Sequence, residues 1–205
     1  FTLGPLGAAL LGFITLPILT WFFSQEDIGR LAMLNVVTGL SVLLFSLGLD
    51  QAYVREFHES ENQPALLKVT IFPGFTLLSI DNIISNSLFT IDSFELSLLA
   101  ALAILCTFVS RFLSLILRMN EQGVAYSMSQ LLPKLLMILI ILSYVTLNVS
   151  KSFTNLVIAN VSAITFVSIV YAWNTRNEWL LSLRQSIDLN YLRELLKFSM
   201  PLILG

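Results

Sequence analysis

Long apolar runs separated by short polar breaks form the main pattern of the chain. A helix that crosses a membrane needs about 20 mostly apolar residues, and six stretches reach this length. They cover residues 1–23, 31–49, 67–90, 95–117, 123–147 and 153–173, and a seventh begins near Leu195. No stretch alternates with the period of two that is typical of membrane β-barrels. The pattern predicts an all-α membrane protein, in which each helix satisfies its own backbone hydrogen bonds.

The polar breaks predict turns, one loop and one surface segment. Residues 24–30 begin with Ser24 or Asp27 as a helix cap. Residues 50–64 are predicted to be the longest early loop, and Pro64 is suited to open the third helix. Short turns are expected at 90–95, 118–123 and 147–152. After Trp173 leucines alternate with charges, a pattern typical of an amphipathic segment on the membrane surface.

The composition supports lipid as the solvent and excludes several classes of function. Only 12% of the residues are charged and 56% are hydrophobic, whereas a soluble domain carries about 25% charged residues. The net charge of −2 does not favour nucleic acid as a partner. The single cysteine, Cys106, excludes a disulfide framework. Because the sequence has no phosphate-binding loop, metal-ligand cluster or catalytic pair, we expect a carrier without a cofactor rather than an enzyme.

The distribution of lysine and arginine among the loops predicts the orientation in the membrane. If the loop after the second span is cytoplasmic, seven basic residues lie inside and two lie outside. The inside set is Arg55, Lys68, Arg118, Arg176, Arg184, Arg193 and Lys197, and the outside set is Arg30 and Lys151. Since basic loops favour the cytoplasmic side, the amino terminus is expected to be cytoplasmic.

Three ionisable residues lie within the predicted spans: Asp81, Arg111 and Lys134. Each costs on the order of 3 kcal/mol at the bilayer centre, so such residues usually face a bundle interior or a wet cavity. Depth along the helices would allow Lys134 to pair with Asp81. Asp81 is expected to act as a counter-ion or as a coupling-ion site. Arg111 has the alternative of extending to the cytoplasmic headgroups.

Polar residues at helical spacing share a face with these charges. The predicted polar faces are Asn35 and Thr38 in the second span, Thr107, Arg111, Ser114 and Arg118 in the fourth, and Ser127, Gln130 and Lys134 in the fifth. Two cations against one carboxylate leave an excess of +1, or +2 if Arg118 lies at the rim. The sequence therefore predicts a cationic cavity that selects anions, with Arg111, Lys134 and Arg118 as its substrate-binding cations.

Two stretches resemble a known family. Residues 22–59 resemble the start of the polysaccharide-biosynthesis flippases, the Wzx-type O-antigen and exopolysaccharide transporters. The matching positions are Ser24, Glu26 and Gly29 in the first turn, and Leu47, Gly48, Leu49, Ala52 and Arg55 after the second helix. Residues 192–205 are similar to the family's entry into its seventh helix. The middle of the chain matches only in hydropathy.

The resemblance implies the fold of the multidrug/oligosaccharidyl-lipid/polysaccharide exporter superfamily, with two six-helix lobes around a central cavity and 12 to 14 spans in all. Both ends of the sequence lie inside apolar runs, so we expect the chain to be part of a longer protein. Residues 1–175 would then form the amino-terminal six-helix lobe. Residues 176–192 would form a cytoplasmic amphipathic linker between the lobes, and residues 193–205 the start of a seventh membrane helix.

The resemblance also implies a function. Such proteins move an undecaprenyl-diphosphate-linked oligosaccharide, the repeat unit of O-antigen or another exopolysaccharide, across the bacterial inner membrane by alternating access. The implied partners are this lipid-linked substrate, the bilayer, and the polysaccharide polymerase and chain-length machinery. The cations of the cavity would contact the diphosphate.

Two other functions stay open. The first is a cation-coupled multidrug extruder of the same superfamily, which usually needs a carboxylate in its first helix. Residues 1–23 contain none, and Asp81 is the only deep candidate. The second is a non-transporting membrane scaffold whose buried charges fix helix packing. A scaffold predicts that every buried charge has a partner.

Overall fold

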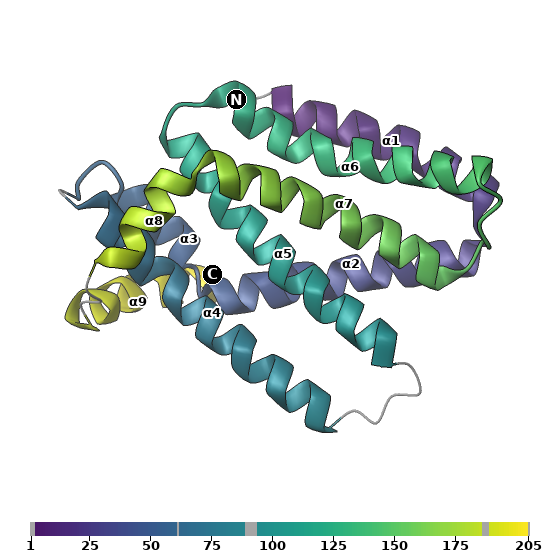
Figure 1. The fold of residues 1–205 in the computed structure, drawn as a ribbon. Helices are drawn as coiled ribbons and strands as arrows, with labels where there is room; N and C mark the ends of the chain where they lie inside the picture. Colours follow the sequence, from purple (N-terminus) through teal and green to yellow (C-terminus); the bar gives the residue numbers. More distant parts are fainter. Residues whose placement is uncertain (1–2, 61, 89–93, 186–188, 205) are drawn as a thin grey trace.

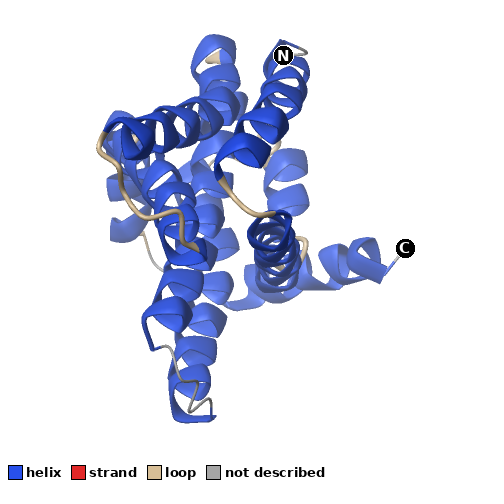
Figure 2. Cartoon of the chain, turned by 90° about the vertical axis from the view of Figure 1, so that its right-hand side faces the viewer, coloured by secondary structure: helices blue, strands red, loops and turns tan. Residues whose placement is uncertain are grey.

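In the part of the chain that the structure describes, α-helices are joined by turns and loops (Figure 2). The structure is a computed structural model that describes the backbone of residues 3–60, 62–88, 94–185 and 189–204, and side chains at 4, 6–60, 62–78, 95–185, 191–197 and 199. The helices are α1 (Leu3–Phe22), α2 (Gln25–Ser46), α3 (Leu49–Glu56), α4 (Gln63–Leu88), α5 (Phe94–Met119), α6 (Gly123–Thr146), α7 (Phe153–Asn174), α8 (Arg176–Arg184) and α9 (Leu189–Leu204).

The long helices coincide with the predicted apolar runs, which confirms the all-α membrane class. Four helices, α2, α5, α6 and α7, are long and apolar enough to cross a membrane, and residues 6–22 of α1 form a shorter apolar helix. Both statements refer to the part of the chain that the structure describes. The count of six spans and the cytoplasmic amino terminus stay predictions.

Helix α2 begins earlier than its apolar run because its first turn is polar. Ser24, one of the two predicted caps, is the N-cap, and its hydroxyl oxygen accepts a hydrogen bond from the backbone N–H of Asp27 at 3.1 Å. Glu26 and Asp27 lie in the first turn, where negative charge is favourable to the helix dipole. The helix therefore starts at Gln25 rather than at residue 31.

Helix α3 corrects the prediction of a loop over residues 50–64. Leu47 and Gly48 both adopt the left-handed conformation, with φ of 50° and 68°, and this ends α2 and turns the chain. Leu49, Ala52 and Tyr53 then recur at helical spacing and are buried. Burial of this face stabilises a short helix in a segment that its many polar residues made resemble a loop.

The helices alternate in direction, so their connections gather at two ends (Figure 1). Helices α3, α8 and α9 and the turn between α5 and α6 lie at one end, and the α1–α2 and α6–α7 turns lie at the other. Helix α7 packs between α5 and α6, while α2 packs against α4, α5 and α7. The predicted linker 176–192 contains all of α8 and the beginning of α9. The carboxyl end of α9 points away from the bundle (Figure 2).

Small residues set two close helix contacts. On α1, a Cβ atom at Gly4 would lie 2.9 Å from Cα of Ser127 in α6, and one at Gly7 would lie 2.8 Å from a methyl of Leu131. On α4, a Cβ at Gly74 would lie 2.2 Å from the ring of Phe108 in α5. Such contacts let membrane helices approach closely, where dispersion between backbones replaces the missing hydrophobic driving force.

Candidate functional site

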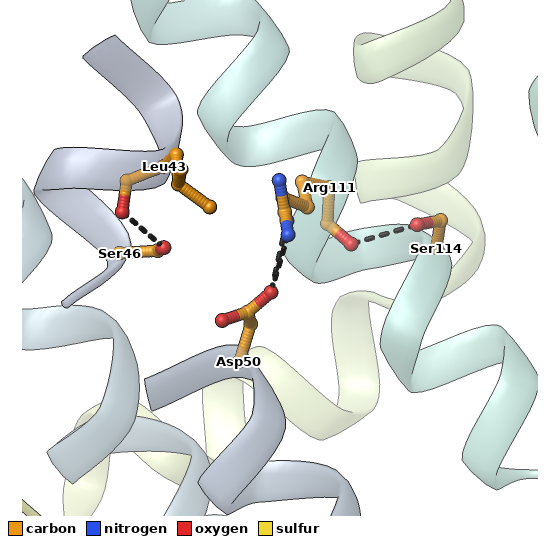
Figure 3. A network of polar contacts seen from close by, with 5 residues as sticks. All are labelled: Leu43, Ser46, Asp50, Arg111 and Ser114. Atoms are coloured by element: carbon orange, nitrogen blue, oxygen red, sulfur yellow. Dashed lines mark hydrogen bonds and ion pairs between the residues drawn. The ribbon is translucent and has the colours of Figure 1, made fainter. Parts of the chain in front are cut away.

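Arg111 and Asp50 form an ion pair between α5 and the start of α3 (Figure 3). The Nε and one terminal nitrogen of Arg111 donate to the same carboxylate oxygen, Oδ2 of Asp50, at 3.0 and 2.6 Å. The side chain of Asp50 is 4% exposed and that of Arg111 is 36% exposed. The carboxylate is therefore buried, while the guanidinium lies at the edge of the packed region.

The pair changes the predicted charge balance. The sequence placed Asp50 in a loop, and the sum of two cations and one carboxylate omitted it. With Asp50 counted beside Asp81, two carboxylates balance Arg111 and Lys134, and an excess of +1 remains only if Arg118 is added. The predicted sum therefore omitted one carboxylate, because the turn at Gly48 brings Asp50 back against α5.

Arg111 keeps donors that Asp50 does not use. A guanidinium carries five N–H donors, and two of them point to Asp50. The backbone carbonyl of Arg111 accepts a hydrogen bond from Ser114 at 2.7 Å (Figure 3). Asp50 thus holds the guanidinium in one orientation, and the partly exposed remainder of its planar fork is able to contact an anion bidentately.

Lys134 lies at the contact of α6 with α1, on a different interface from Arg111. Its ammonium donates to the backbone carbonyl of Ala8 at 2.5 Å, and it lies 3.3 Å from where a Cβ of Gly12 would be. The small residues of α1 therefore make room for the lysine. The predicted pairing of Lys134 with Asp81 has no test, because the side chain of Asp81 lies outside the described residues.

The remaining predicted residues lie on α2, α5 and α6, and the hydrogen bonds of the described chain do not join them into one network. Asn35 of α2 accepts a hydrogen bond from Asn160 of α7 at 3.2 Å. Thr107 and Ser114 donate to carbonyls of their own helix, Thr38 is buried, Ser127 packs against Gly4, Gln130 is half-buried and Arg118 is exposed. Whether these residues line a substrate path stays a prediction.

A cavity of about 430 Å³ lies elsewhere, between α4, α5, α7 and α8, and we call it the lateral groove. It is lined by Lys68, Ile71, Phe72, Phe75, Phe108, Val109, Phe112, Leu113, Ile116, Ala172, Trp179, Ser182 and Leu183. None of the predicted substrate-binding cations is in this set. In the described part of the chain, no three His, Cys, Asp or Glu side chains are placed to hold a metal ion.

Glu178 of α8 is a half-buried carboxylate that the sequence did not single out. Its Oε1 accepts a hydrogen bond from the Asn120 side chain at 2.7 Å, which ties α8 to the turn between α5 and α6. Its Oε2 is buried without a hydrogen-bond partner among the described residues. Burial raises the pKa of Glu178, and the bond from Asn120 lowers it in part. Burial and then the charge of Glu178 raise the pKa of Tyr53.

Comparison with known proteins gives one match. The family model described as "Polysaccharide biosynthesis protein" matches residues 1–205. No curated protein and no solved structure shows a significant match. The family match covers the middle of the chain, where hydropathy alone supported the resemblance, as well as the two stretches that carried it.

Proposed function

Since the chain belongs to the polysaccharide biosynthesis protein family, the family of Wzx-type flippases, we propose that it serves to move a lipid-linked oligosaccharide across a membrane. The observation that carries the proposal is the match over residues 1–205 of a chain whose long helices are apolar enough to span a bilayer. Members of this family are generally transporters rather than enzymes. The substrate class that fits is an undecaprenyl-diphosphate-linked repeat unit of O-antigen or exopolysaccharide in the bacterial inner membrane.

The proposed mechanism uses the cations at the edges of the packed helices. Arg111, oriented by Asp50, offers its remaining N–H donors to the diphosphate. Lys134 supplies a second positive charge from α6. Arg118 lies about two helical turns beyond Arg111 on α5. The polar residues Asn35 and Gln130 would contact sugar hydroxyls. Alternating access would move this lobe, residues 1–175, against a second lobe, and the polymerase and chain-length machinery would receive the product.

The experiment separates binding from packing by using the ion pair itself. In the full-length parent protein, expressed in a strain without its own flippase, Arg111→Gln is compared with the double variant Asp50→Asn/Arg111→Gln. The double variant removes the buried carboxylate together with the cation, so it avoids leaving Asp50 unpaired. Surface polysaccharide is measured at matched membrane levels of each variant, with Lys151→Gln as the charge control at the other end of the bundle.

The proposal expects the double variant to accumulate normally and to lose most surface polysaccharide, and Lys134→Gln to lose it as well. Normal export by the double variant and by Lys134→Gln would show that these cations serve packing only. The assignment of substrate-binding cations would then be withdrawn, while the family membership would stand.

A specific observation favours a second candidate, a non-transporting membrane scaffold. That function predicts a partner for every charge within the spans. Of those whose side chains the structure describes, Arg111 has Asp50 and Lys134 has the carbonyl of Ala8. The two candidates differ in the strain without a flippase, since a scaffold cannot restore any surface polysaccharide on its own. Restoration by the unmodified full-length protein would exclude the scaffold.

A further inference from the structure

The lateral groove opens on the outer surface of the bundle. Its rim includes Phe72, Phe75 and Leu183, which are 43%, 38% and 59% exposed. Its floor includes Phe108 and Phe112 of α5, which are fully buried and whose ring centroids are 5.0 Å apart. The ring of Phe75 meets that of Phe108 edge-on at 5.5 Å. Aromatic rings from two helices therefore line the groove.

The groove has the size and the lining of a ligand site for hydrocarbon. A volume of about 430 Å³ lies within the usual range for ligand pockets, roughly 300–1,000 Å³. Its walls are almost entirely apolar, and Lys68 and Ser182 are its polar residues. Water needs two to four polar partners to be retained in a cavity. An apolar chain, and not water, is the occupant that such walls favour in a membrane.

One end of the groove is positively charged. The ammonium of Lys68 donates to the backbone carbonyls of Leu183 and Gln185, at 2.9 and 2.7 Å, where α8 ends. An ammonium has three donors, so one N–H remains after these two bonds. Arg184, between the two carbonyls in sequence, is exposed. A negative headgroup at this end would meet both cations, while its chain entered the groove.

The groove is separate from the proposed transport site. At 100° per residue, the α5 residues that line the groove lie between about 60° (Phe108) and 160° (Val109) around the helix from Arg111. A diphosphate held at Arg111 would therefore face a different side of α5 from most of the groove. The groove does not depend on the proposed function.

We propose that the lateral groove binds one acyl chain of an anionic phospholipid, with the phosphate of that lipid at Lys68 and Arg184. The acyl chain fills the space between α4 and α5, and the headgroup binds beside the carboxyl end of α8. The leaflet on the cytoplasmic side supplies anionic lipids, and the basic residues of α8 suit that side. The lipid thereby links α8 to the membrane-spanning helices.

The experiment uses Trp179, which lines the groove, as the reporter. In the full-length parent protein all other tryptophans are replaced by phenylalanine, including the exposed Trp21 and Trp173. The protein is reconstituted in phosphatidylcholine vesicles that contain increasing fractions of brominated phosphatidylglycerol or brominated phosphatidylcholine. Bromine on the acyl chains quenches the fluorescence of a tryptophan in contact with them.

Brominated phosphatidylglycerol is expected to reach half-maximal quenching of Trp179 at a lower mole fraction than brominated phosphatidylcholine. Each cation that contacts the phosphate should lower this mole fraction about fivefold. Arg184→Gln, at an exposed residue, should reduce this preference, whereas Lys151→Gln should leave it unchanged. Val109→Phe should fill the groove and weaken the quenching, and Leu139→Phe, at a residue 59% exposed on α6, is its matched control.

Equal quenching by the two lipids would overturn the proposal, because it indicates ordinary contact with the surrounding bilayer. So would a lipid preference that Arg184→Gln leaves intact. If unbrominated undecaprenyl diphosphate relieves the quenching and unbrominated phosphatidylglycerol does not, the groove belongs to the prenyl tail of the substrate and the phospholipid assignment is wrong. All of these measurements are made without transport, so they remain valid whatever the outcome of the polysaccharide assay.

Discussion

The Asp50–Arg111 pair predicts an asymmetric response to the loss of either partner. Arg111→Gln leaves a carboxylate that is 4% exposed without a countercharge, whereas Asp50→Asn leaves a guanidinium that is 36% exposed. An exposed guanidinium is able to bind water or a headgroup, and a buried carboxylate is not. The arginine variant should therefore unfold more easily than the aspartate variant, although each removes the same ion pair.

The magnitudes follow from the burial of the group that remains. Removing one partner of a buried pair costs about 3–5 kcal/mol, and this range applies to Arg111→Gln. For Asp50→Asn we expect about 1–2 kcal/mol, since the amide oxygen still accepts a hydrogen bond from Arg111. The double variant has no buried charge at this place and should cost about 2 kcal/mol. The coupling energy in the double-mutant cycle is then about 2 kcal/mol or more.

The assay is reversible unfolding of the full-length parent protein in detergent, with all four proteins of the cycle measured under the same conditions. Helix content by circular dichroism verifies that the native states are alike before unfolding. Additivity of the two single variants within about 0.5 kcal/mol would refute the ion pair. A cost of Asp50→Asn larger than that of Arg111→Gln would refute the argument from burial.

The other predictions concern single positions and are checked by thermal unfolding in detergent. Gly74→Ala should cost about 1–3 kcal/mol of stability because its Cβ would lie 2.2 Å from the ring of Phe108. At Gly39 an added Cβ would meet no other atom within 4 Å, so Gly39→Ala should be neutral or stabilising by up to about 1 kcal/mol. Ser24→Ala should cost about 1 kcal/mol through the lost N-cap. Burial raises the pKa of Glu178 above 4.5, so the folded state keeps this proton to higher pH than the unfolded state does. Stability therefore falls as the pH rises through the window between the unfolded pKa and the raised folded pKa. Glu178→Gln should remove this pH dependence and stabilise the protein above the window, and an unchanged pH profile would contradict the reasoning.

The helix positions were predictable from the sequence because lipid imposes a length on each apolar run. The fifth and sixth runs, predicted at 123–147 and 153–173, are helices at Gly123–Thr146 and Phe153–Asn174. Helix α3 was missed because its polar composition resembles a loop. A signal was present all the same: Leu49, Ala52 and Tyr53 repeat at helical spacing directly after a glycine.

The candidate site was less predictable because it depends on contacts between distant segments. The face of Arg111 on its helix could be derived from spacing, yet its partner comes from a residue 61 positions away. For Lys134 the sequence suggested Asp81 as the partner, whereas the described acceptor is the backbone carbonyl of Ala8, which no sequence pattern indicates. Periodicity indicates which face of a helix is polar but not which helix that face meets.

The contact between α1 and α6 has a consequence for the order of assembly during synthesis. The hydrogen bond from Lys134 to Ala8 joins residues 126 positions apart. At a synthesis rate of about 5–20 residues per second, Lys134 is therefore made roughly 6–25 s after Ala8. Residues 3–22 carry no charge and can wait in the bilayer without a partner. Lys134 enters only when the glycine-rich face of α1 is already in place to receive it. The uncharged helix precedes the charged one, and this order spares the growing chain an unpaired ammonium in lipid.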